Sequence, residues 1–112
     1  MELESYYITG FVDGEGTFNL VRYPDGRIRP QFLVFNTDKS ILEQIKETLK
    51  LNCPIFEVMR IKDLIKKGKK CYRLQARSKE DIRKVIQFFD QNLPIVKSKD
   101  YEIFKKAYSD WI

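Results

Sequence analysis

An N-terminal segment that is apolar on most sides of an α-helix constrains the fold of this chain more than any other feature. Residues 3–13 favour a helix, but their apolar side chains do not keep to a single stripe. A helix that is apolar nearly all round is buried on both sides. We expect it to end at Asp13-Gly14-Glu15-Gly16. Its apolar members are Leu3, Tyr6, Tyr7, Ile8, Phe11 and Val12.

Two glycines lie four residues apart on this predicted helix, at Gly10 and Gly14. Small residues at that spacing let two helix backbones approach closely, a geometry that is best documented in membranes. One copy of the helix is therefore expected to pack against another of its kind. This would account for a segment that is apolar on more than one side.

Alternation of apolar and polar residues predicts two β-hairpins in the rest of the chain. The first has strands over residues 17–23 and 27–35, joined by the turn signal Pro24-Asp25-Gly26. The second has strands over residues 55–62 and 71–77. Each hairpin brings its own two strands together in antiparallel direction.

Helical spacing of apolar residues lies between and after the hairpins. Thr37 or Asp38 is expected to cap the helix between them. Ser78 opens another helix with the spacing of a capping box, and a final helix begins near Ser98. The order α-β-β-α-β-β-α-α predicts one α+β domain over residues 1–112, with its helices on one face of the sheet.

Residue types that the chain lacks exclude several kinds of chemistry. It contains no histidine, which excludes Ser-His-Asp and Cys-His nucleophilic catalysis. Cys53 and Cys71 stand alone, so neither a Cys/His zinc site nor a disulfide framework is expected. No apolar run approaches the roughly 20 residues of a membrane span, and Met1-Glu2-Leu3-Glu4 is not a basic signal-peptide opening. We expect a reduced, intracellular protein in which any catalysis uses carboxylates, lysines and a hard cation.

The net charge of +5 comes from one segment. Residues 60–77 carry eight basic residues and one acid, so this segment is +7 while the rest of the chain is −2. A concentrated basic segment on an otherwise balanced domain is typical of a polyanion site. A solvated hairpin tip without a partner is the alternative. The basic residues are Arg60, Lys62, Lys66, Lys67, Lys69, Lys70, Arg73 and Arg77.

One face of the predicted sheet carries long polar side chains in place of an apolar layer. Arg and Gln bind guanine and adenine edges bidentately in the major groove, and none of the eight polar residues is acidic. Antiparallel sheets often have one solvated polar face, which is the alternative explanation. The residue types on this face favour the binding of nucleic acid. The eight are Asn19, Tyr23, Arg27, Arg29, Gln31, Arg73, Gln75 and Arg77.

Asp13 and Glu15 flank a glycine at the predicted C-terminal end of the first helix. Acids are unfavourable there because this end of the helix dipole is negative. A hard divalent cation would compensate them, and Mg²⁺ typically takes only one or two protein carboxylates. An ordinary acidic turn, in which Gly14 or Gly16 supplies positive φ, is the alternative without a metal.

The segment Ile8-Thr9-Gly10-Phe11-Val12-Asp13-Gly14-Glu15-Gly16 resembles the nine-residue signature of the LAGLIDADG homing endonucleases. The following Thr17-Phe18 and the preceding tyrosines are also typical of that family. The predicted element order is similar to the family's αββαββα core, so the resemblance covers nearly the whole chain. It implies a four-stranded antiparallel sheet shaped like a saddle.

The resemblance also implies roles for individual residues. Glu15 matches the metal-binding catalytic carboxylate, and Gly14 lies beside it in the metal site. Asn36 matches a polar residue that orders water near the metal. Lys99 matches a basic residue that polarises the solvent network or stabilises charge on the phosphate. Lys97 is the competing assignment, and a plain surface lysine is the alternative role of Lys99.

Two interfaces follow from the resemblance. In a homodimer, the motif helix would pair with its copy through Tyr7, Gly10, Phe11, Asp13 and Gly14. The open sheet face would contact double-stranded DNA, and the basic tip would mainly grip phosphates. The implied DNA contacts are Thr17, Asn19, Val21, Tyr23, Arg27, Arg29, Gln31, Leu33, Lys66, Lys67, Lys69, Lys70, Arg73, Gln75 and Arg77.

The implied activity is site-specific, Mg²⁺-dependent cleavage of both strands of a long near-palindromic DNA site, leaving 3′ overhangs. Ca²⁺ is expected to support binding without cleavage. Two alternatives remain: a catalytically degenerate DNA- or RNA-binding module, such as a maturase or regulator, and a dimerisation domain without nucleic acid. The expected location is the cytoplasm or nucleoid, or an organelle whose genome encodes the protein. No membrane or small-molecule substrate is expected.

Overall fold

A computed structural model of the chain describes residues 4–58 and 70–112. The helices are α1 (Ser5–Glu15), α2 (Lys39–Leu49), α4 (Lys79–Gln91) and α5 (Ser98–Trp111). The strands are β1 (Gly16–Arg22), β2 (Ile28–Asn36), β3 (Ile55–Val58) and β4 (Cys71–Ala76). The end of the predicted third strand and the tip lysines Lys66, Lys67 and Lys69 lie outside the described residues.

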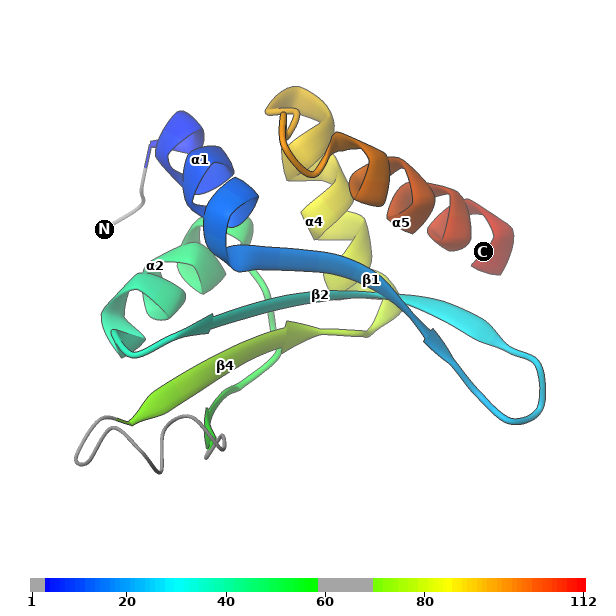
Figure 1. Cartoon of the computed structure of the whole chain (residues 1–112), viewed down its shortest axis with the longest axis horizontal. Coiled ribbons are helices and arrows are strands. Elements are labelled where there is room, and N and C mark those ends of the chain that lie inside the picture. Colours follow the sequence, from blue (N-terminus) through cyan, green and yellow to red (C-terminus); the bar gives the residue numbers. More distant parts are fainter. Residues whose placement is uncertain (1–3, 59–69) are drawn as a thin grey trace.

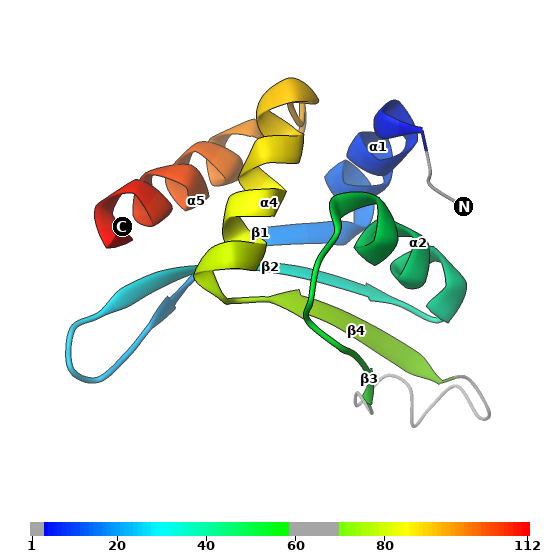
Figure 2. The same ribbon diagram turned by 180° about the vertical axis from the view of Figure 1, so that it is seen from behind.

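The strands form one antiparallel sheet in the order β1-β2-β4-β3. All four helices cover the same face of this sheet (Figures 1 and 2). The other face is open, and the sheet curves away from the helices toward both ends, which makes the open face concave (Figure 1). The predicted α+β fold, with helices on one face only, is therefore confirmed.

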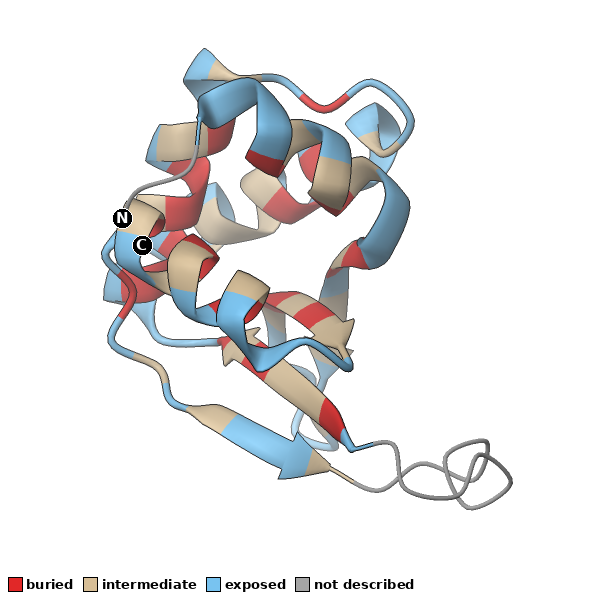
Figure 3. Cartoon of the chain, turned by 90° about the vertical axis from the view of Figure 1, so that its left-hand side faces the viewer, coloured by how far each residue is buried: buried red, intermediate tan, exposed pale blue. Residues whose placement is uncertain are grey.

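The core lies between the sheet and the helices (Figure 3). Phe18 on β1 packs its ring 5.2 Å, centroid to centroid, from each of Phe89, Tyr101 and Phe104. These contacts join α4 and α5 to the first strand. The face of each strand that meets the helices is the apolar one, as the alternation of residues predicts. No helix among the described residues is long and apolar enough to cross a membrane.

Two helix starts follow the sequence closely. Asp38, and not Thr37, caps α2 by accepting a hydrogen bond from the Ser40 N–H at 3.0 Å. The hydrogen bonds from the Ser40 hydroxyl and backbone lower the pKa of Asp38. Ser78 caps α4 by accepting from the Asp81 N–H at 3.1 Å, as predicted.

The carboxylate of Asp81 has a different role from the one that a capping box gives it. It accepts hydrogen bonds from the backbone N–H groups of Asn52 and Cys53, at 2.9 and 3.0 Å. This ties the start of α4 to the segment that follows α2. Burial, with the nearby Asp81 charge, raises the pKa of the Cys53 thiol to about 11, so this cysteine is unreactive at neutral pH.

Candidate functional site: an acidic helix end above an open sheet face

The C-terminal end of α1 delivers Glu15 directly into the sheet. The helix continues to Glu15, two residues beyond the predicted end at Asp13, and the Gly16 N–H closes the last turn on the Val12 carbonyl. Gly16 pairs with Val34 in β2, so Glu15 lies close to the end of that strand, where Asn36 is located. The register therefore brings two of the three predicted catalytic residues to the same end of the sheet.

Asp13 and Lys97 join this helix end to the segment between α4 and α5. The Asp13 carboxylate accepts hydrogen bonds from the N–H groups of Ile95 and Lys97, at 2.8 and 3.2 Å. The Lys97 ammonium donates to the carbonyls of Val12 and Asp13, at 3.1 and 2.8 Å. A cation on the last carbonyls of a helix is favourable for both the helix dipole and the orphan acceptors. Lys97 thus compensates the helix end that the two acids disfavour.

Lys99 differs from Lys97 in having no such structural task. It lies in the first turn of α5, is exposed, and has no hydrogen bond or ion pair within the described residues. Asn36 is half-buried, and its side-chain oxygen accepts from the Asp38 N–H at 2.8 Å, which leaves its NH2 for water or a ligand. The structure thus brings the Lys97 side chain to the acidic helix end, whereas no contact among the described residues brings Lys99 to it.

The donor set at the helix end fits a hard cation only if other molecules complete it. Glu15 is exposed, and among the described residues its carboxylate has no partner. Gly14 lies in the last helical turn, whose carbonyls have no partner further along the helix. No group of three or more Asp, Glu or Cys side chains in the described part of the chain forms a closed metal site. One carboxylate and a carbonyl suit Mg²⁺, which keeps waters and takes phosphate oxygens.

The outward side of α1 is exposed in the single chain. Ile8 and Val12 face the core and are fully buried, but Tyr6 and Tyr7 are 78% and 50% exposed. The expected burial on both sides is therefore not achieved within one chain. A Cβ added at Gly10 or Gly14 would meet nothing within 4 Å, so neither glycine is required by a contact among the described residues.

Three amides form a ladder across the open face. Asn19 and Gln31 are directly paired across β1 and β2. The Gln31 NH2 donates to the Asn19 side-chain oxygen at 2.9 Å, and the Gln75 NH2 of β4 donates to the Gln31 side-chain oxygen at 2.6 Å. Gln31 is only 8% exposed. It was predicted as a DNA contact, but the structure engages both ends of its amide within the sheet.

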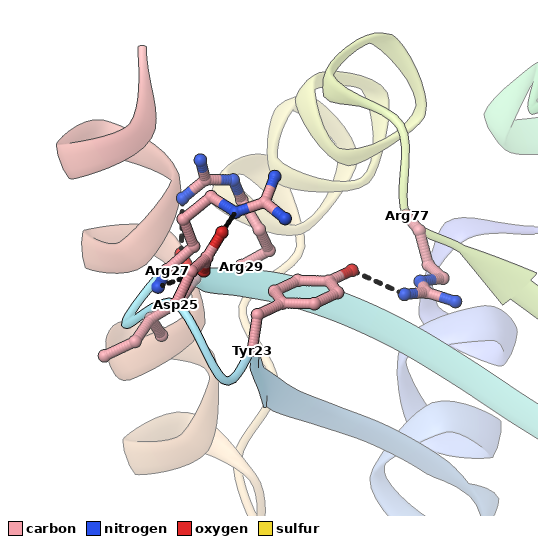
Figure 4. A network of polar contacts seen from close by, with 6 residues as sticks. Tyr23, Asp25, Arg27, Arg29 and Arg77 are labelled. Carbon is pink, nitrogen blue, oxygen red and sulfur yellow. Dashed lines mark hydrogen bonds and ion pairs between the residues drawn. The ribbon is translucent and has the colours of Figure 1, made fainter.

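The end of the open face near the β1–β2 turn carries a second network of polar side chains (Figure 4). The Arg77 guanidinium donates to the Tyr23 hydroxyl at 2.6 Å, which connects the residue after β1 to the residue after β4. Asp25 in the turn pairs with Arg27 at 2.7 Å, and the hydrogen bond from the Arg27 N–H lowers the pKa of Asp25. Both side chains of this pair are more than half exposed. Arg27 and Arg77 are thus exposed and Tyr23 is partly exposed.

Arg29 departs from the predicted row of DNA contacts. Its guanidinium lies 4.9 Å from the ring centroid of Trp111 on α5, the helix that packs on the opposite, core side of the sheet. It also donates to the Ile28 carbonyl at 2.9 Å. Cation–π attraction to the C-terminal tryptophan explains this placement. Strand alternation could not reveal it, because the contact joins residues that are far apart in the sequence.

The sequence analysis did not single out two aromatic residues of the open face. Phe35 and Phe56 are the register partners of Arg73 on β2 and β3, so all three share one side of the sheet. The Arg73 guanidinium lies 5.5 Å from the centroid of the Phe56 ring, which is 47% exposed. Phe35 follows Leu33 by two residues, so strand alternation already contained its signal. The position of Phe56 required the β3–β4 register.

The described part of the basic segment supports its expected exposure. Lys70 is exposed, and its ammonium nitrogen lies 3.8 Å from a carboxylate oxygen of Glu57 on β3. The predicted contacts Thr17, Val21 and Leu33 are each partly exposed on β1 and β2. Gln75 and Arg73 lie on β4 beside them. The open face thus carries amides, guanidinium groups and a few partly exposed apolar side chains.

The match to known proteins agrees with this arrangement. Residues 8–108 match the LAGLIDADG endonuclease family. Because this match covers most of the chain, the chain belongs to that family. The matched residues include all of the described strands, Asp13 and Glu15 at the end of α1, and Lys97, which contacts that helix end.

The chain is similar to parts of longer proteins. The chain is 30% identical over 107 residues to the 50.9 kDa protein in ND4 intron 1 of Podospora anserina, covering 94% of this chain and 24% of that protein. The homing endonuclease I-GzeII, solved in complex with its DNA target, is 32% identical with a TM-score of 0.77, over 96% of this chain and 36% of that one. The homing endonuclease I-TnaI has 22% identity and a TM-score of 0.75, over 95% and 71% of the two chains. The chain thus spans about a quarter of the length of the intron-encoded relative.

Proposed function

We propose that this protein is a site-specific DNA endonuclease that acts as a homodimer and cleaves both strands with Mg²⁺. The observation that carries the proposal is the exposed Glu15 carboxylate, which has no partner among the described residues and lies at the end of α1, next to the first strand of a sheet whose open face carries amides and guanidinium groups. A protein that only binds DNA has no use for an unpaired acid beside a phosphate. The similarity to a DNA-bound homing endonuclease supports the same conclusion.

The proposed dimer forms through the outward side of α1. Tyr7, Gly10 and Gly14 meet the same residues of a second copy, together with the part of Phe11 that the core leaves exposed, and Asp13 holds the helix ends through its loop contacts. Two copies of α1 then place two Glu15 side chains close to the symmetry axis. Two-fold symmetry of the protein requires a roughly palindromic DNA site. Cleavage beside the axis in both strands gives the expected 3′ overhangs.

The chain's own residues supply most of the cleavage site. Glu15 and the Gly14 carbonyl would hold a hard cation, whose charge would stabilise the negative charge that develops during phosphodiester hydrolysis. The free NH2 of Asn36 orients water near this site. The exposed Lys99 ammonium stabilises the phosphate, while Lys97 keeps the helix end in place. Ca²⁺ is expected to support binding without hydrolysis.

The open face and the basic segment bind the DNA. The curved sheet lies in the major groove, where the amides and guanidinium groups meet base edges and the exposed lysines meet phosphates. The protein is expected to work where its DNA target is, in the nucleoid or cytoplasm or in an organelle. The intron-encoded relative from Podospora supports a location with intron-containing DNA.

The proposal is tested by comparing the wild type with Glu15→Gln on a plasmid library that carries randomised sites. The wild type in Mg²⁺ is expected to produce breaks with 3′ overhangs. The variant is expected to cut at least about 100-fold more slowly, because its neutral amide holds a cation poorly. Both proteins are expected to retain the same DNA in Ca²⁺.

Glu102→Gln provides the matched control, since Glu102 is an exposed acid on α5. It removes the same charge and is expected to leave cleavage unchanged. Salt-sensitive binding by both proteins without cleavage by either would contradict the endonuclease and indicate a degenerate binding module. An absence of salt-sensitive binding would exclude both and leave a dimerisation domain.

A further inference from the structure

The amide ladder has a direction. Gln75 donates to Gln31, and Gln31 donates to Asn19, so all three amides point the same way across β4, β2 and β1. A primary amide has two N–H donors at one end and a carbonyl acceptor at the other. The bond that each amide makes within the ladder therefore decides which end it presents to the open face.

The two ends of the ladder present opposite chemistry. The Asn19 oxygen is occupied by Gln31, so the exposed Asn19 side chain offers its NH2, which is a donor only. Gln75 uses one N–H toward Gln31 and keeps its carbonyl together with a second N–H. A donor alone suits the O6 and N7 acceptors of guanine. A carbonyl beside an N–H suits the N6 and N7 pair of adenine.

The middle amide controls both ends without being available to DNA. Gln31 is 8% exposed, and both of its polar ends are engaged inside the sheet. Asn19 and Gln75 lie on strands separated by one strand, about 10 Å apart, so they meet different base pairs. We propose that Gln31 is a positioning residue that couples the base preferences of Asn19 and Gln75, selecting guanine at the first and adenine at the second. This inference rests on the proposed DNA binding.

The experiment measures base preferences by selecting randomised duplex DNA with the full chain in Ca²⁺. Asn19→Ala and Gln75→Ala first identify the two positions of the selected sequence that each side chain determines. Gln31→Glu then replaces the donating end by a second acceptor. The carboxylate still accepts from Gln75, but Asn19 must turn round to donate to it. Asn19 then presents its oxygen to the DNA.

The expected result of Gln31→Glu is a change at one position only. The preference at the Asn19 position should switch from guanine toward cytosine or adenine, by about tenfold, while the adenine at the Gln75 position stays. Gln31→Met removes both bonds while keeping the length of the side chain. It should weaken the preference at both positions together.

Two controls separate this effect from charge and from folding. Gln87→Glu adds the same charge at an exposed position of α4, on the helical side of the sheet, and should leave every base preference unchanged. In the free protein, Gln31→Met should shift the side-chain amide NMR signals of both Asn19 and Gln75. Signals of amides outside the ladder, such as Gln91, should not move.

The outcomes distinguish this inference from the proposed function. If the wild type selects a sequence and Gln31→Glu lowers affinity equally for all sequences, Gln31 is merely structural and the inference is overturned while DNA recognition stands. If the wild type selects no sequence, DNA recognition fails and the coupling fails with it. A switch confined to the Asn19 position supports both.

Discussion

The two sides of α1 are made of similar small and apolar residues but are used differently. On the inner side, Val12 is fully buried, and a Cβ added at Gly16 would lie 2.7 Å from its Cγ1 atom. On the outer side, a Cβ added at Gly10 or Gly14 would meet nothing within 4 Å. A glycine inside a helix costs about 1 kcal/mol relative to alanine. Folding of the described chain therefore explains the glycine at 16, whereas the proposed homodimer would explain those at 10 and 14.

The largest expected effect on stability comes from truncating a side chain on the inner side of α1, compared with one on its outer side. Ile8→Ala should lower the free energy of unfolding by about 3 kcal/mol, because Ile8 is fully buried and its removal leaves a cavity. Tyr6→Ala on the outer side should change it by less than about 0.5 kcal/mol, since Tyr6 is 78% exposed. Urea denaturation at low protein concentration measures both. Equal losses would show that the two sides are not distinct.

The next effect tests the close contact at Gly16. Gly16→Ala should cost about 2 kcal/mol, because the new methyl group collides with Val12. In a Val12→Ala background the same change should cost about 1 kcal/mol less, since Cγ1 is gone while the Val12 backbone remains at 3.1 Å. A double-mutant cycle from urea denaturation measures this coupling. Additive losses would mean that the side chain of Val12 is not the obstacle.

A smaller effect distinguishes the two lysines near the helix end. Lys97→Met should lower the free energy of unfolding by about 1 kcal/mol, because two α1 carbonyls lose a charged donor. Lys99→Met should leave stability within about 0.5 kcal/mol and should slow cleavage. Thermal denaturation and the plasmid cleavage assay give the two readings. The reverse result would make Lys97 the active-site lysine.

The smallest expected effect is a gain in stability, where the others are losses. Gly14→Ala should raise the free energy of unfolding of the single chain by about 0.5 to 1 kcal/mol, through helix propensity in open space. Urea denaturation at a protein concentration too low for assembly isolates this effect. Gly16→Ala serves as the contrast, because the same substitution two residues away destabilises. A loss of stability at both positions would show that Gly14 already has a neighbour within the chain.

Periodicity and turn residues predict most of this fold. The alternation around Phe18 and Phe32 identifies the core side of the first hairpin, and the caps at Asp38 and Ser78 follow from local hydrogen bonding. The end of α1 was placed two residues early, at Asp13. The Lys97 side chain that satisfies its last carbonyls comes from a distant segment, so local signals could not predict it.

The site could be predicted in part. The motif resemblance identifies Glu15, Asn36 and the Lys97 or Lys99 pair, and the structure brings the first two to one end of the sheet. Alternation puts Gln31 on the open face but cannot show that two neighbouring amides bury it. It also cannot show that Arg29 stacks on Trp111. Cross-strand partners and contacts with α5 determine these side chains, and both depend on the register.

Sedimentation of the wild type beside Gly14→Leu tests the central claim that the outer side of α1 binds a second copy. The account predicts a wild-type dimer of twice the 13.4 kDa chain mass. It predicts a folded monomer for Gly14→Leu, because a Cβ at this position meets nothing within 4 Å in the described chain, whereas a larger side chain separates two paired helices. A wild type that remains monomeric, or a variant that dimerises equally well, would contradict the account.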